Sequence, residues 1–358
     1  MSRGRRYLAV LVLAALLIPS LGMFVAPYET HSVEERRMLA PTPPAPRTLT
    51  DWLALPRAAD AFFADHFAWR GPMVKAALRL DASAQMKPRG AFQAIRGRDD
   101  WLLLYPGLLG LTGGQTNPRA AERYGRFVCG LQADARARGA TFLFAPAPGP
   151  VEIYPDAAPD WVQHGSPTQP DLVLQAARAC GVEPLDLRPV LAAAKGMGRL
   201  YQHHDSHWTD LGALVAFDAM ATRLGRPWSE DPKVLPWRQE KRADSDLIRL
   251  SGEVGLEPEV VTSLIPPAGL STVAGRVGDL DHGTYPPAFE ARPPGATTTV
   301  LIVGDSYSAD FMPALFWRAG VALVWIHEAE CGFDRRVLDR VRPDVVVLTP
   351  SSRLAACR

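Results

Sequence analysis

From residue 120 to the end of the chain, apolar runs of strand length alternate with segments of helical periodicity. Strands that are apolar throughout and separated by helices are typical of a parallel sheet with both faces covered. The pattern predicts an α/β fold, a three-layer α/β/α sandwich with a parallel sheet. The predicted strands are 141–148, 182–187, 298–306, 321–329 and 344–349. The predicted helices are 120–139, 171–181, 189–197, 210–225, 308–320 and 335–341.

Three other segments depart from this alternation. Residues 51–82 carry apolar side chains at helical spacing, and residues 94–105 (AIRGRDDWLLLY) are typical of a β-hairpin around a GRDD turn. Residues 226–297 are rich in proline, glycine and charge. We expect this last segment to be an insertion that either shapes a groove or runs over the surface.

The N-terminus carries an uncharged, mostly apolar stretch from Tyr7 to Ala26. About 20 apolar residues are what one helix needs to cross a hydrocarbon layer of ~30 Å. Arg3, Arg5 and Arg6 precede it, which by the positive-inside rule keeps the N-terminus in the cytoplasm. A cleaved signal peptide is the alternative, although Pro27 directly after Ala26 is a poor cleavage context. The sequence therefore favours an uncleaved N-terminal membrane anchor helix.

This anchor sets the expected organisation. We predict an anchor at 1–27, a proline-rich stalk at 28–50 and one large domain at 51–358. The location that follows is a single-pass protein of the cell inner membrane with its domain in the periplasm.

Composition narrows the function classes. The formal net charge is +1, and no basic block occurs outside the extreme N-terminus, which argues against a nucleic-acid partner. Four cysteines occur without a CxxC pair, so the spacing of a zinc knuckle is absent from the sequence. In an oxidising periplasm the expected disulfides are Cys129–Cys180 and Cys331–Cys357, although spacing alone leaves other pairings open.

The first candidate for chemistry is VLIVGDSYSADF, residues 300–311, where an apolar strand runs into Gly304, Asp305 and Ser306. Such a serine sits at the carboxyl edge of the sheet, near a helix start where backbone N–H groups can hold an oxyanion. A serine hydroxyl needs a base to act as a nucleophile. The alternative is that Ser306 only caps a helix and Asp305 only forms a turn.

The second candidate, YQHHDSHWTDLGA at 201–213, supplies that base. Asp205 and His207 are one residue apart, so the carboxylate can hold one imidazole nitrogen while the other faces a serine. We expect Trp208 to pack behind the imidazole, and Thr209 or Asp210 to cap the next helix. A metal site and a purely structural loop are the alternatives; the HExxH spacing of a helical zinc site does not occur here, and we predict no metal or other cofactor.

With these residues in place, the sequence resembles the SGNH hydrolase-like domain of alginate O-acetyltransferases, the AlgJ/AlgX type. Ordinary SGNH hydrolases have the GDS serine first, whereas here the Asp205–His207 pair precedes it, in the permuted order of the acetyltransferases. The resemblance extends to residues 34–41, 62–75, 95–105, 146–156 and 343–354. Two departures are Gly149 and Pro150, where the family tends to carry a lysine, and Ser352, where a glutamate is usual.

The resemblance implies a polysaccharide O-acetyltransferase in which Ser306, His207 and Asp205 transfer acetyl to sugar hydroxyls. It implies a polysaccharide acceptor, and an acetyl donor delivered by a membrane-bound O-acyltransferase. An acetylesterase with the same triad, and a non-catalytic glycan-binding or assembly protein, are the alternatives. Candidate substrate-binding residues are Trp208, Tyr307 and Tyr154, for which packing in the core is an equal alternative, and Arg353, which either binds donor or acceptor oxygens or holds the loop of the last strand.

Overall fold

The computed structural model describes residues 7, 30–32, 37–67, 70, 73, 94–109, 116–251, 256–281, 285–354 and 357. The chain divides into two compact units, residues 1–86 and 87–358. The predicted anchor at 1–27 lies outside the described residues except for Tyr7. Within the described ranges, no helix combines the length and the apolar character needed to span a bilayer.

The first unit contains a two-residue antiparallel pair, β1 (His31–Ser32) with β2 (Arg37–Met38), and the helix α2 (Leu49–His66). Thr48 begins α2 with a capping box, because its side chain accepts the amide of Asp51 while the Asp51 carboxylate accepts the Thr48 amide. Of the residues 51–82 with helical spacing, α2 contains those up to His66 and starts two residues earlier, and most of 68–82 lies outside the described residues. The helix α2 belongs to the first unit and not to the larger one.

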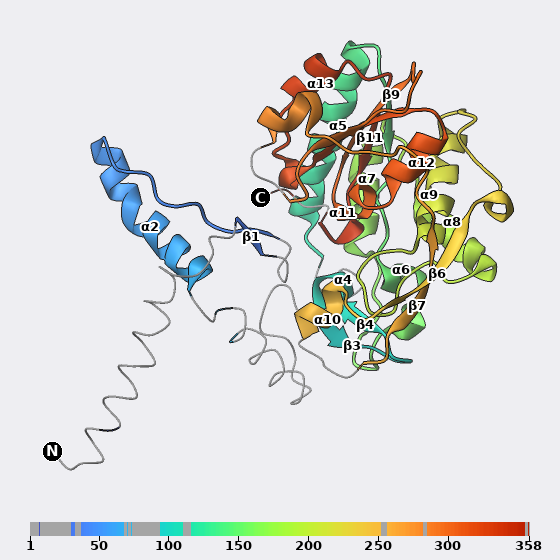
Figure 1. Cartoon of the computed structure of the whole chain (residues 1–358), viewed down its shortest axis with the longest axis horizontal. Coiled ribbons are helices and arrows are strands. Elements are labelled where there is room, and N and C mark those ends of the chain that lie inside the picture. The colour runs from blue at the N-terminus through green and yellow to red at the C-terminus, as the bar shows by residue number, and fades with distance from the viewer. Residues whose placement is uncertain are drawn as a thin grey trace. The chain divides into compact units, whose positions relative to one another are not determined.

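A five-stranded sheet forms the centre of the second unit, with strand order β5-β11-β9-β10-β8 (Figure 1). The first four strands run parallel, and β8 pairs antiparallel with β10 at the edge. The strands are β5 (Thr141–Phe144), β8 (Phe289–Ala291), β9 (Thr299–Gly304), β10 (Ala322–His327) and β11 (Val345–Thr349). The predicted parallel sheet is therefore confirmed for four strands, whereas β8 adds an antiparallel edge that the sequence analysis did not predict.

Helices cover both faces of this sheet, because side chains along each strand point alternately to the two sides. Val300 and Ile302 of β9 enter one core cluster, and Leu301 and Val303 enter the other. The first cluster is covered by α8 (Leu187–Ala194), α9 (Asp210–Arg223) and α12 (Met312–Arg318). The second is covered by α5 (Pro118–Ala137), α7 (Gln169–Arg178) and α13 (Arg336–Val341).

The strand predicted at 182–187 does not form. Pro184 has no amide hydrogen to donate to a ladder, and the described backbone makes one bond to β5, from the Leu185 amide to the Phe144 carbonyl at 2.8 Å. Asp186 then accepts the Arg188 amide and begins α8. The apolar run is therefore an extended connection that turns into a helix.

Smaller elements surround the sandwich. The predicted hairpin forms as β3 (Ala94–Arg96) and β4 (Leu102–Leu104). Residues 226–297 contain the antiparallel pair β6 (Trp237–Arg242) and β7 (Glu259–Leu264), the helix α10 (Asp246–Ser251) and the edge strand β8, so this segment is partly built into the sheet. The short helices are α4 (Tyr105–Leu109), α6 (Pro150–Ile153), α11 (Ser306–Ala309), η2 (Pro155–Ala157), η3 (Lys195–Met197), η4 (Pro232–Val234), η5 (Gly275–Leu280), η6 (Ala329–Cys331) and η7 (Ser352–Leu354).

Both expected disulfides are present. Cys129 of α5 is bonded to Cys180 just after α7, with 6.2 Å between their Cα atoms, so this bond joins two helices on one face of the sheet. Cys331 is bonded to Cys357, with 5.2 Å between their Cα atoms, and this bond ties the C-terminal segment to the loop after β10.

Candidate active site

The turn after β9 presents Ser306 at the carboxyl edge of the sheet. Asp305 begins α11 by accepting the Tyr307 amide at 3.0 Å, and its second carboxylate oxygen accepts the Ser351 amide at 2.7 Å. Asp305 is therefore the capping residue, and Ser306 is the first residue of the helix, half-buried where the turn opens. A Cβ on Gly304 would lie 2.3 Å from the Ser308 hydroxyl oxygen, so only glycine fits before this turn.

The histidine stretch folds into a tight loop that ends at α9. The Gln202 amide donates to the His207 carbonyl at 3.2 Å, and the Thr209 amide donates to the Leu200 carbonyl at 2.8 Å. Thr209 caps α9 by accepting the Gly212 amide, as one of the two predicted caps. The loop thereby brings the side chains of Asp205 and His207 together.

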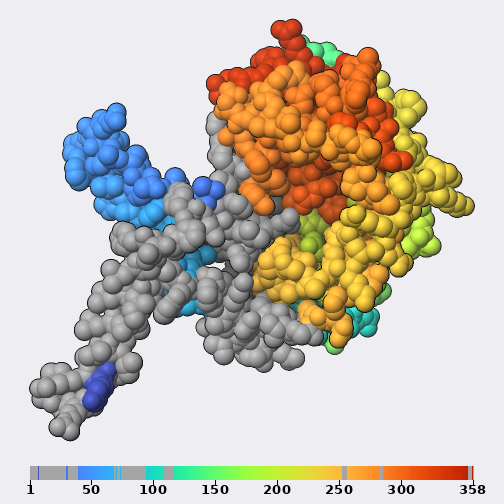
Figure 2. Space-filling view, in the orientation of Figure 1, coloured from blue at the N-terminus to red at the C-terminus, as the bar shows by residue number. Residues whose placement is uncertain are grey.

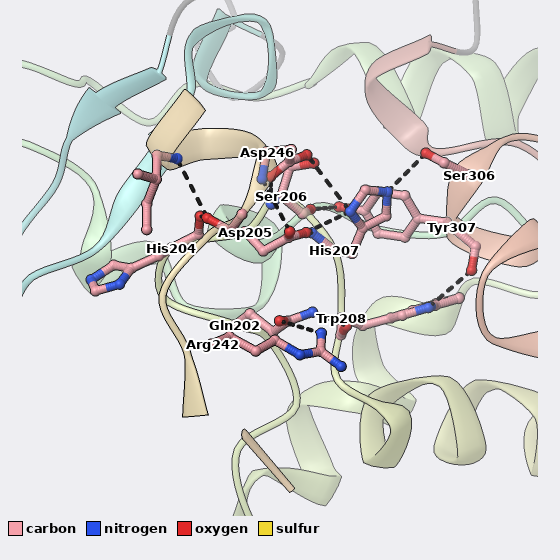
Figure 3. Close-up of polar contacts among 12 residues, drawn as sticks. Gln202, His204, Asp205, Ser206, His207, Trp208, Arg242, Asp246, Ser306 and Tyr307 are labelled. Atoms are coloured by element: carbon pink, nitrogen blue, oxygen red, sulfur yellow. Dashed lines mark hydrogen bonds and ion pairs between the residues drawn. The ribbon is translucent and has the colours of Figure 1, made fainter. Parts of the chain in front are cut away.

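The three predicted side chains form one hydrogen-bonded row (Figure 3). Nδ1–H of His207 donates to Oδ1 of Asp205 at 2.6 Å, and the Ser306 hydroxyl donates to Nε2 of His207 at 2.8 Å. The His207 side chain is 3% exposed, and that of Asp205 is 16% exposed. The carboxylate therefore fixes the tautomer whose Nε2 is free to accept the serine proton, which is the geometry of a Ser-His-Asp triad.

The aromatic ring that packs on the imidazole is that of Tyr307 and not that of Trp208. The centroids of the Tyr307 and His207 rings are 4.9 Å apart, whereas Trp208 stands edge-on to Tyr307 at 5.2 Å. The Trp208 indole N–H donates to the Tyr307 carbonyl at 3.1 Å, and the Tyr307 hydroxyl donates to the Ser206 carbonyl. Both side chains are fully buried. They position the histidine loop against the serine turn, and their burial keeps them from a bound substrate.

The other two candidate substrate contacts lie in different surroundings. Tyr154 is half-buried between Trp101, with ring centroids 5.3 Å apart, and Tyr201, at 6.2 Å. Arg353 is half-buried beside the row: its guanidinium lies 5.3 Å from the Tyr307 ring centroid, and Nη2 lies 3.5 Å from the Ser206 hydroxyl. Of these two, only Arg353 lies next to the triad residues.

Gly149 and Ser352, at which the chain departs from the family pattern, both bond to the buried carboxyl group of Glu152. Glu152 of α6 accepts the Gly149 amide at 3.2 Å and the hydroxyl of Ser352. Burial raises the pKa of Glu152 to about 7, with the Ser352 and Gly149 hydrogen bonds opposing that shift. A carboxyl group is therefore present next to position 352, although it is contributed by another segment of the chain.

The two neighbouring histidines do not enter the row. The His203 ring stacks on Trp101 with centroids 4.3 Å apart, and burial lowers the pKa of His203. His204 is buried and points away from His207 (Figure 3). Their backbone amides donate to the Glu259 carboxylate at 2.9 and 3.2 Å, so both residues help to hold the loop.

The sequence analysis missed Asp246, which α10 places beside the row. Its carboxylate oxygen Oδ2 lies 3.7 Å from Nδ1 of His207, and the residue is 4% exposed. Burial raises the pKa of Asp246, and the charge of Asp205 adds to the shift. No sequence motif points to Asp246, because residues 226–297 have no regular periodicity.

Atoms of Asp205, His207 and Asp246 lie within 4.8 Å of one another, a spacing that could hold a metal ion. In this arrangement Nδ1 of His207 donates to Asp205 and Nε2 accepts from Ser306. A metal on either nitrogen would replace one of these bonds, so the observed hydrogen bonding is that of a base and not of a metal ligand.

Residues 226–297 border a hollow in the surface of the second unit. Figure 2 shows a hollow in the second unit between the orange and gold parts of this segment, with the red-orange of residues after 300 and the green of residues near 200 at its base. A separate cavity of about 620 Å³ lies at the β6–β7 hairpin, and no residue of the row lines it.

Comparisons with known proteins identify the family of this chain. Residues 94–325 match the family described as SGNH hydrolase-like domain, acetyltransferase AlgX. The "Probable alginate O-acetylase AlgJ" of Pseudomonas aeruginosa is 29% identical over 139 residues, which is 37% of this chain and 32% of that relative's length. The chain therefore aligns with about a third of that relative.

Two solved structures share the fold. The O-acetyltransferase domain of Pseudomonas putida AlgJ superposes with a TM-score of 0.51 at 21% identity, over 74% of this chain and 92% of that one. Bacillus cereus PatB1 superposes with a TM-score of 0.56 at 13% identity, over 74% of this chain and 97% of that one. Because the family match spans well over half of the sequence, this chain belongs to the AlgX acetyltransferase family of SGNH hydrolase-like domains.

Proposed function

We propose that this chain is an O-acetyltransferase that transfers acetyl groups to the hydroxyls of a polysaccharide. The observation that carries the proposal is the row from Asp205 through His207 to Ser306, with hydrogen bonds of 2.6 and 2.8 Å, in a chain of the AlgX acetyltransferase family. The name of the AlgJ relative, an alginate O-acetylase, supports acetyl as the transferred group and a polysaccharide as the class of acceptor.

In the first half-reaction, the Ser306 oxygen attacks the carbonyl carbon of a donor acetyl ester. Nε2 of His207 takes the hydroxyl proton, and the Asp205 carboxylate stabilises the resulting imidazolium through Nδ1–H. The bond between the acetyl carbon and the donor oxygen then breaks. The leaving oxygen receives the proton from Nε2, which leaves acetyl-Ser306 and a neutral imidazole.

In the second half-reaction, a sugar hydroxyl gives its proton to Nε2 of His207 as its oxygen attacks the acetyl carbon. The ester bond to Ser306 breaks, and the proton on Nε2 returns to the serine oxygen. The products are the acetylated sugar and the free enzyme, with no other reactant consumed. Water attacks by the same route, so the acceptor has to exclude water from acetyl-Ser306 for transfer to prevail.

We further propose that the chain works at the outer face of the inner membrane and receives acetyl from a membrane-bound O-acyltransferase. The uncharged stretch from Tyr7 to Ala26, preceded by three arginines, supports an anchor. The disulfides Cys129–Cys180 and Cys331–Cys357 support an oxidising compartment. Residues 28–50 would then act as the stalk between the anchor and the domain.

The test uses the purified full-length chain with 4-nitrophenyl acetate as donor and an unacetylated alginate oligosaccharide as acceptor. We expect acetylated oligosaccharide by mass spectrometry, and a loss of ester turnover of roughly 10³-fold or more in Ser306→Ala. Ser271→Ala, at an exposed serine, is the matched control and should retain full turnover.

Three outcomes would contradict the proposal. Unchanged turnover in Ser306→Ala would remove this serine from the chemistry. Release of free acetate without any acetylated sugar would make the chain an acetylesterase, and a complete lack of turnover with retained oligosaccharide binding would make it a glycan-binding protein.

A further inference from the structure

A second carboxylate lies behind His207, and it comes from a different part of the chain than Asp205. Asp246 is the first residue of α10, within the segment 226–297. Figure 3 shows its carboxylate beside that of Asp205, on the side of His207 that faces away from Ser306. A third segment of the chain therefore reaches the base.

The contacts of Asp246 are directed at the loop that carries His207. Oδ1 accepts the Ser206 amide at 2.8 Å, and Oδ2 accepts the Ser206 hydroxyl at 2.5 Å. The Asp246 amide donates to Oδ2 of Asp205 at 3.3 Å. Asp246 thus holds the residue between Asp205 and His207 and also orients the Asp205 carboxylate.

The charged groups around Asp246 change its pKa in opposite directions. The groups that face it are Asp205 and His207 in the loop, the Tyr307 phenol, and Arg353, whose Nη2 lies 3.5 Å from the Ser206 hydroxyl. Burial and the charge of Asp205 raise the pKa of Asp246, whereas the charge of His207 lowers it. A charged imidazole is therefore the state of His207 that the second carboxylate favours.

We infer that Asp246 is a positioning residue for the base: together with Asp205 it holds His207 in the Nδ1–H tautomer and stabilises the imidazolium that forms in each half-reaction. This inference rests on the proposed acetyl transfer. It assigns a task to residues 226–297, which deliver one of the two carboxylates on which the base depends. Asp246 acts through Ser206, Asp205 and His207, as a positioning residue that is 4% exposed.

The test is the pH dependence of kcat/KM for 4-nitrophenyl acetate in Asp246→Asn. An opposite charge within 4–6 Å of a titrating group changes its pKa by about 1–3 units. We therefore expect the acid limb of the profile, which reports the free imidazole, to move at least about one pH unit lower. On the plateau kcat should fall about tenfold or more, with KM unchanged, because the imidazolium is less stabilised.

Asp244→Asn is the matched control, since Asp244 lies two residues earlier and bonds to Arg249 on the exposed side of the helix. Its profile should superimpose on that of the wild type. A profile of Asp246→Asn with an unmoved acid limb, including a uniform loss at every pH, would overturn the inference, because that is the signature of a structural defect alone.

Asp205→Asn gives a second test that does not require Asp246→Asn to fold. Loss of a sole triad aspartate costs about 10⁴-fold in kcat, so with the Asp246 carboxyl group still beside Nδ1 of His207 we expect a loss of at most about 10³-fold. A loss of 10⁴-fold or more would contradict the inference. Ser306→Ala distinguishes failure of the proposed function from failure of this inference. If Ser306→Ala stays active, the proposed acetyl transfer by Ser306 is refuted. If Ser306→Ala is inactive and Asp246→Asn behaves like the wild type, only the role of Asp246 is refuted.

Discussion

Glu328 is a carboxyl group buried directly behind the serine turn, and its ionisation should control the stability of the fold. It follows β10 and is 1% exposed, and its amide donates to the Gly304 carbonyl at 2.9 Å. The Tyr124 hydroxyl donates to its Oε2 at 3.1 Å. Burial raises the pKa of Glu328 from its ordinary value of 4.5 to about 8, and the charge of Asp305 adds to the shift.

Whether stability rises or falls with pH depends on whether the folded or the unfolded protein holds the proton on Glu328. Between pH 4.5 and 8 the folded protein keeps a proton on Glu328 that the unfolded chain has released, so stability falls as the pH rises through this range. Each unit of difference in pKa corresponds to about 1.4 kcal/mol. The full difference is therefore roughly 5 kcal/mol, and it is reached above pH 8.

Glu328→Gln keeps the size of the side chain and its acceptor oxygen but cannot ionise. We expect the variant to match the wild type near pH 4.5 and to exceed its free energy of unfolding by several kcal/mol at pH 9. With a urea m-value of about 3 kcal/mol/M, a difference of about 5 kcal/mol moves the unfolding midpoint by about 1.7 M. Urea titrations at pH 4.5, 7 and 9 measure this.

The control is Glu122→Gln, at an exposed glutamate on α5 two residues before Tyr124. Its midpoint should follow that of the wild type at all three pH values. If Glu328→Gln differed from the wild type by the same amount at every pH, or were the less stable protein at pH 9, the reasoning from burial would be refuted.

Two further predictions concern the site itself. Gly304→Ala should destabilise the fold by about 1–3 kcal/mol and lower ester turnover, because the new Cβ would lie 2.3 Å from Oγ of Ser308 and 3.0 Å from the Thr349 carbonyl. Thermal unfolding and ester turnover measure these effects. A variant with unaltered stability and turnover would show that the turn can relax. Excess EDTA should leave turnover unchanged, because both imidazole nitrogens of His207 already bond to Asp205 and Ser306; inactivation that added zinc reverses would speak against this.

The sequence predicted what short-range patterns determine. Continuous apolar runs located the parallel strands β5, β9, β10 and β11, because both faces of such strands are buried. The one-residue spacing of Asp205 and His207 predicted their bond, and the edge position of two loops predicted the meeting with Ser306 across 99 residues. The strand predicted at 182–187 was wrong, because Pro184 has no amide hydrogen to donate and Asp186 caps the helix that follows.

The missed features depend on where distant segments run. Asp246 reaches Ser206 from 40 residues away, along a segment without periodicity that no pattern could place. Tyr307, and not Trp208, packs on the imidazole because the turn into α11 directs its side chain back toward the histidine loop, while Trp208 is bonded to the Tyr307 carbonyl. β8 joins the sheet with three residues, too few for its apolar pattern to stand out.

Different parts of the molecule position the nucleophile Ser306 and the base His207. A substitution can therefore affect one of these residues without affecting the other. Ser306 is positioned by the end of β9 and by Asp305, which bonds to the Ser351 amide after β11. His207 is positioned by its own loop and by Asp246 of α10, which lies outside the parallel strands. A substitution within residues 226–297 can therefore reach the base without moving the serine, and its effect should appear in the pH dependence of turnover before it appears in the reactivity of Ser306.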